Sequence, residues 1–131
     1  MQEFRKVTVK VPQQWLDLIN QVFDIEKKSF QIKEEHSIYR NINKLRDLIE
    51  NELFKGTAGT VGLSYHNPIG ETYSDTRTDC EASIAGTSAD NLEIVEVIKP
   101  IIFYSYLEDE KVIKAIVQKA VVVAKSKETT I

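Results

Sequence analysis

The sequence predicts an α+β fold in which a helical first half is followed by a strand-rich second half. No Gly or Pro lies between Gln13 and Lys55, whereas beyond residue 55 both recur among β-branched residues. Because Gly and Pro are the strongest breakers of regular structure, this change of composition marks a boundary. The glycine-containing run at residues 55–60 separates a helical region, residues 1–55, from a small β region, residues 61–126.

The first helix is predicted to begin at Pro12, whose fixed φ and missing N–H suit a first helical turn. Apolar side chains then recur at steps of three and four, as an amphipathic helix requires. This first stripe consists of Trp15, Leu18, Val22 and Ile25.

A second stripe starts out of phase with the first. It consists of Ile38, Ile42, Leu45 and Ile49. The polar run at residues 33–36 precedes it, and Ser37 stands where a helix cap is expected. Two helices joined by a turn are therefore favoured, with one continuous helix as the alternative.

The second half alternates apolar runs with turn residues, as short strands do. The acidic run Glu108-Asp109-Glu110 is predicted to form a hairpin turn. The predicted strands are Ile94–Ile98, Ile101–Leu107, Val112–Val117 and Ala120–Ala124.

Composition argues against several classes of function. A formal net charge of -3 gives no basic surface for nucleic acid, and the longest apolar stretch, residues 120–124, is too short to cross a bilayer. A single cysteine permits no intramolecular disulfide, and neither histidine has a second ligand at helical spacing. We expect a cytoplasmic protein without metal or cofactor, with no nucleic-acid or membrane partner.

The densest polar cluster, Asp75 to Glu81, raises the question of catalysis. Arg77 could activate the Cys80 thiolate, but cysteine catalysis also needs an oriented general base, and the sequence marks none. The favoured interpretation is a hydrogen-bonded loop with Cys80 packed as a small apolar residue, and His66 as a turn residue bonded to nearby backbone. We therefore expect a binding protein rather than an enzyme, with a cysteine-dependent redox protein as the alternative.

Several blocks of the chain, in order, resemble GrpE-type nucleotide-exchange factors, which are cochaperones of DnaK-type chaperones. In the first half, Trp15 to Lys27 resembles the first bundle helix and Ile42 to Phe54 the helix leading into the β head. In the second half the matching blocks are Gly70 to Asp75 followed by Cys80-Glu81-Ala82, then Ile94 to Pro100, then Lys119 to Lys125. The chain departs from the family at Ile101-Ile102, which replace Gly-Tyr, and in a longer last hairpin.

The resemblance implies a homodimer held by a four-helix bundle, with two helices from each protomer. It also implies a β head that binds the nucleotide-binding domain of a DnaK-type chaperone and promotes ADP release in protein folding and the stress response. An adaptor that binds without promoting exchange is the alternative. The dimer interface would contain Trp15, Leu18, Val22, Ile25, Ile42, Leu45 and Ile49. The partner-binding residues would be Glu71, Tyr73, Val97, Lys99, Lys114 and Val123.

Overall fold

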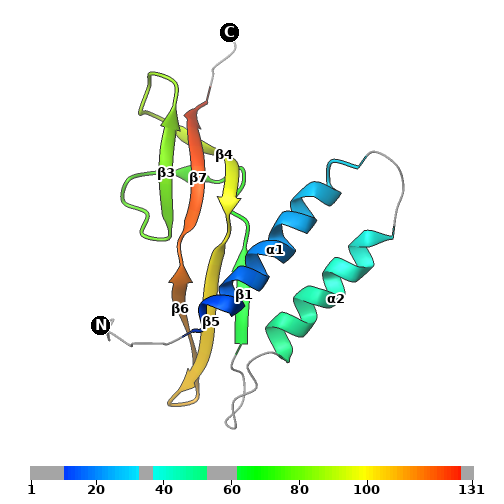
Figure 1. Ribbon diagram of the computed structural model, residues 1–131. Helices are drawn as coiled ribbons and strands as arrows, with labels where there is room; N and C mark the ends of the chain where they lie inside the picture. The colour runs from blue at the N-terminus through cyan, green and yellow to red at the C-terminus, as the bar shows by residue number, and fades with distance from the viewer. Residues whose placement is uncertain (1–10, 33–36, 53–61, 128–131) are drawn as a thin grey trace.

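The computed structural model describes residues 11–32, 37–52 and 62–127 and has the predicted α+β order. Two helices, α1 (Gln13–Ser29) and α2 (Ile38–Asn51), precede seven strands arranged in two sheets (Figure 1). The predicted run at residues 33–36 and the predicted boundary at residues 55–60 lie outside the described residues.

The two-helix interpretation is confirmed. Pro12 is the residue before α1, and its carbonyl accepts a hydrogen bond from the Trp15 amide at 3.0 Å. The chain leaves α1 at Phe30, and α2 begins after Ser37. Ser37 is the N-cap residue, as expected, but its side chain makes no capping hydrogen bond. The hydroxyl therefore adds nothing to the stability of α2 through this contact.

One sheet has three antiparallel strands in the order β1-β5-β6. The other has four strands in the order β2-β4-β7-β3, in which β3 pairs parallel to β7. The strands are β1 (Gly62–His66), β2 (Thr72–Tyr73), β3 (Cys80–Ala85), β4 (Leu92–Lys99), β5 (Ile101–Glu108), β6 (Lys111–Gln118) and β7 (Ala120–Ser126).

The two sheets are linked through one long bent hairpin. Strand β4 continues into β5 across Pro100, and β6 continues into β7 across Lys119. The hairpin turns at Asp109 and Glu110, which both have positive φ (49° and 65°) and lie inside the predicted acidic turn. All four strands predicted for this segment are confirmed, each longer than expected by one to three residues. Proline cannot donate to a strand ladder, which explains why pairing is interrupted at Pro100.

Helices and strands share one hydrophobic core. From α1 the core takes Ile19, Val22 and Phe23, and from α2 it takes Ile49. These side chains pack with residues of both sheets, among them Leu63, Ile94, Ile101, Ile102 and Val122. Figure 1 shows α1 lying across the strands, with α2 beside it. The helical region is therefore held against the β region by apolar burial, the dominant favourable term in folding.

Candidate interaction surfaces

The residues predicted for a dimer interface differ in how deeply they are buried in the protomer. Val22, Ile42 and Ile49 are 2–3% exposed and lie inside the protomer. Trp15 is partly buried against the core. Leu18, Ile25 and Leu45 instead remain on the surface, 46%, 47% and 37% exposed. Of the predicted residues, only the exposed three, together with the partly buried Trp15, have apolar surface left for another chain.

The exposed members belong to a longer pattern that we call the open seam. Leu18 and Ile25 on α1 are seven residues apart, as are Ile38 and Leu45 on α2, and the exposed Ile32 lies just beyond the end of α1. Leu48, three residues after Leu45, is also exposed. A seven-residue repeat keeps side chains on one side of a helix and is typical of helices that pack against other helices. The open seam thus consists of Leu18, Ile25, Ile32, Ile38, Leu45 and Leu48.

A buried polar network fixes both helices to β1. The Tyr65 hydroxyl donates to the Glu26 carboxylate at 2.9 Å, and Arg46 Nη1 donates to the same oxygen at 3.4 Å. The Arg46 guanidinium also lies 4.5 Å from the centre of the Tyr65 ring. Burial and the Glu26 carboxylate raise the pKa of Tyr65 well above its usual value. Because one carboxylate on α1 serves donors from α2 and β1, the helix pair is held in one orientation.

The predicted partner-binding residues do not form a single surface. Lys99 and Val123 share the outer face of the four-stranded sheet, where Lys99 pairs with Val121 and Glu96 with Val123. Lys114 lies on the other sheet, its ammonium 5.5 Å above the Phe103 ring.

Val97 must be removed from the predicted contact set. Its side chain is 2% exposed and packs in the core, opposite Val122. The adjacent breaks in register, between Ile94 and Glu96 and between Val97 and Lys99, change the side on which successive β4 residues point. Tyr73 is half-buried and also packs against the core. Neither bulge could be located from the apolar alternation of the sequence.

In the cluster that was predicted to be a hydrogen-bonded loop, Glu71 and Asp79 form a structural clamp around Arg77. Its Nε and Nη2 donate to the two oxygens of Asp79 at 2.9 and 3.0 Å, which lowers the pKa of that carboxyl. The guanidinium also reaches Glu71 at 3.1 Å and the carbonyl of Thr72 at 3.1 Å. Such a bidentate pair is among the stronger charge-assisted contacts in proteins. The clamp fastens the segment between β2 and β3.

Cys80 lies behind this clamp and is only 6% exposed. Burial raises the pKa of its thiol to about 11, so the protonated form dominates at neutral pH. The thiolate is the nucleophile, and a raised pKa with little exposure is typical of a structural cysteine. The predicted packing of Cys80 as a small apolar residue matches its position.

His66 differs from the prediction in its partner. Its Nε2 contacts the Glu71 carboxylate, whereas a backbone partner was expected. The partner lies five residues away, immediately before β2, because the turn at residues 67–70 folds back on the end of β1. A glycine with φ of 82° at position 70 makes this turn possible.

Sequence reasoning missed two shallow hollows between α1 and β4. The first, about 470 Å³, is lined by residues that include Lys27, Ile69 and Val95, and the second, about 510 Å³, by residues that include Asp24 and Lys99. Between them, the Lys27 ammonium donates to the carbonyl of Val97 at 3.0 Å. The hollows arise where the polar face of α1 meets the irregular part of β4.

Within residues 11–32, 37–52 and 62–127, no group of three or more His, Cys, Asp or Glu side chains is placed to hold a metal ion. Neither described helix is long and apolar enough to cross a membrane. Comparison with protein-family models, curated proteins and solved structures gave no match to the chain.

Proposed function

We propose that the chain is a GrpE-like cochaperone that binds the nucleotide-binding domain of a DnaK-type chaperone in the cytoplasm and promotes ADP release. The observation that carries this proposal is the open seam on a helix pair that precedes a β head. The blocks of sequence that resemble the family occur in the same order. A protein of this design acts by binding, and it needs no catalytic group or cofactor.

The open seam supports the dimeric part of the proposal. Leucine and isoleucine side chains that stay 37–47% exposed in the protomer gain stability when a second copy covers them. Two helices from each of two chains would then form a four-helix bundle with the open seams in its centre. The isologous contact is self-complementary, because each copy offers the same residues to the other.

The exchange activity would arise from preferential binding to one state of the chaperone. A β head that binds the open nucleotide cleft more tightly than the closed one shifts the equilibrium toward the open cleft. Linkage requires the reverse effect as well, so nucleotide binding weakens the complex and ATP releases the cochaperone. The size of the effect equals the difference between the two affinities.

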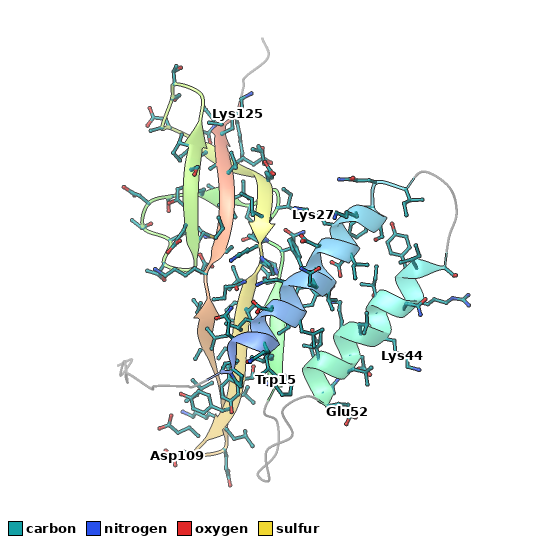
Figure 2. The ribbon with its side chains drawn as sticks, viewed as in Figure 1. Trp15, Lys27, Lys44, Glu52, Asp109 and Lys125 are labelled. Atoms are coloured by element: carbon teal, nitrogen blue, oxygen red, sulfur yellow. The ribbon has the colours of Figure 1, made fainter. Side chains whose placement is uncertain are left out.

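The outer face around Lys99 and Val123 is the head surface we assign to the chaperone. Both residues lie on the four-stranded sheet, and neither contributes to the open seam or to the Arg77 clamp. Replacing Lys99 by Glu and Val123 by Lys alters charge and shape while leaving the core untouched. Lys44→Glu on α2 is the matched control, because Lys44 is exposed on the helix surface away from the strands (Figure 2).

The test is stopped-flow release of a fluorescent ADP analogue from a DnaK-type chaperone of the same source. We expect release to accelerate with the concentration of this protein, and the Lys99→Glu/Val123→Lys variant to lose the acceleration while Lys44→Glu keeps it. Binding without acceleration would instead support the alternative of an adaptor that lacks exchange activity. Absence of binding would refute both proposals.

A further inference from the structure

Among the residues that the structure describes, strand β6 forms an open edge of the three-stranded sheet. It pairs with β5 along its whole length, and no strand among the described residues pairs with its other side. The opposite edge, β1, is covered by α2: a Cβ added at Gly62 would lie 2.3 Å from the Glu50 carbonyl oxygen. Figure 1 shows α2 near β1, and α1 meets β6 at its C-terminal residue, Gln118, whose side chain exchanges hydrogen bonds with Asn20. An open edge offers backbone N–H and C=O groups to another chain.

The exposed side chains on one face of β6 alternate between apolar and positively charged. Val112 and Ile116 are 57% and 43% exposed, and Lys114 lies between them on the same face. The Lys114 ammonium rests over the Phe103 ring of the neighbouring strand, and no carboxylate among the described residues pairs with it. The row therefore presents two apolar positions separated by one positive charge.

Charge determines which kind of strand fits this edge. Residues 111–119 contain Lys111, Lys114 and Lys119 and no acidic residue, although the whole chain has a net charge of -3. A second copy of β6 would bring like charges together. The alternating segment at residues 6–10 of the same chain carries two lysines and no acidic residue. Opposite charges on neighbouring strands stabilise pairing and like charges oppose it, so both occupants are disfavoured.

We propose that β6 binds an extended segment of another protein as an added strand. The segment carries an acidic residue beside Lys114 and an apolar residue two positions away on each side, beside Val112 and Ile116. Strand addition of this kind takes affinity from backbone hydrogen bonds and specificity from alternate side chains. Edge lysines also discourage self-pairing, and the same charge selects an acidic partner. This surface lies on a different sheet from Lys99 and Val123, so the inference does not rest on the proposed chaperone contact.

The test uses a labelled synthetic peptide, Gly-Thr-Ile-Thr-Glu-Thr-Ile-Thr-Gly, and the full chain in a fluorescence anisotropy titration. Its twin has Lys in place of Glu. We expect saturable binding of the acidic peptide, about tenfold tighter than that of the basic twin, because one favourable cross-strand pair replaces a repulsive one. The Lys114→Glu variant is expected to invert this preference, and Lys44→Glu to leave it unchanged.

Backbone pairing is tested separately with two N-methylated acidic peptides, one methylated at odd positions and the other at even positions. Only the peptide whose free N–H groups face β6 is expected to bind. Amide shifts of β6 in ¹⁵N spectra locate the contact. The proposal is overturned if the acidic peptide does not bind, if both methylated peptides bind equally, or if Lys114→Glu does not change the preference for charge.

Discussion

Replacing Tyr65 by Phe tests the buried network that orients the two helices. The change removes only the hydroxyl that donates to Glu26 at 2.9 Å, and the ring stays in the core. The Glu26 side chain is 12% exposed, so water replaces the lost donor poorly. A hydrogen bond to a charged group contributes about 1.5–3 kcal/mol, and we expect a loss of that size in the free energy of unfolding.

Urea unfolding followed by circular dichroism measures this loss. For a small domain the dependence of unfolding free energy on urea is about 1–3 kcal/mol per molar, so the midpoint should fall by roughly 1 M. Tyr39→Phe is the matched control, because Tyr39 is 37% exposed and its hydroxyl makes a longer bond, 3.4 Å, to a neutral acceptor, the carbonyl of Ser29. This variant is expected to lie within about 0.5 kcal/mol of the original protein.

A double-mutant cycle with Glu26→Gln separates the Tyr65 contact from general damage to the core. Glutamine keeps an acceptor for the hydroxyl but removes the charge, so the effect of Tyr65→Phe should shrink in that background. If Tyr65→Phe lowers stability by less than 0.5 kcal/mol, or if its effect is unchanged beside Glu26→Gln, the network does not stabilise the fold as we argue.

Three further predictions concern backbone packing, pH and self-association. Gly62→Ala should cost about 1–3 kcal/mol, seen as a lower melting temperature, because its Cβ would lie 2.3 Å from the Glu50 carbonyl oxygen and the backbone must move. The pKa of Cys80 is raised to about 11 in the folded protein, so the unfolded chain loses this proton first. The protonated thiol contributes fully to the free energy of unfolding below about pH 8.5, and this contribution falls by about 1.4 kcal/mol per pH unit up to pH 11. In urea titrations at alkaline pH, Cys80→Ala should make the free energy of unfolding fall less steeply with pH. Leu18→Glu with Leu45→Glu should yield monomers in sedimentation equilibrium without loss of helix content, and an unchanged dimer, or a monomeric original protein, would contradict the role of the open seam.

The order of elements could be predicted because it depends on local signals. Breakers, turn residues and β-branched runs act within a few positions, and they located α1, α2 and the last four strands. Strand β1 was not predicted, because its residues join the core through contacts with segments that are distant in sequence. The parallel pairing of β3 with β7 joins segments about forty residues apart, and no local pattern specifies it.

The site residues were harder to predict than the helices and strands, because tertiary packing decides whether a side chain points into the core or toward the surface. A residue on β4 points inward or outward according to two bulges, and Val97 was therefore assigned to a surface when it belongs to the core. The Arg77 clamp could be suspected from its charges, but only the fold brings Glu71 and Asp79 to the same guanidinium. A cluster of charged residues near a cysteine looks the same in sequence whether it activates the thiol or fastens a loop.

Helix α1 carries apolar residues on two of its sides. Leu16, Ile19 and Phe23 follow one three-and-four spacing, and Leu18 and Ile25 follow another. The sheet covers the first set, which leaves Ile19 and Phe23 at most 1% exposed, whereas Leu18 and Ile25 stay 46–47% exposed. A helix on the surface of a monomer needs one apolar stripe, with polar residues on its opposite face. The second side of α1 remains uncovered in the protomer, and Ile38, Leu45 and Leu48 of α2 are exposed as well, which is the reason we propose that another helix pair covers both helices.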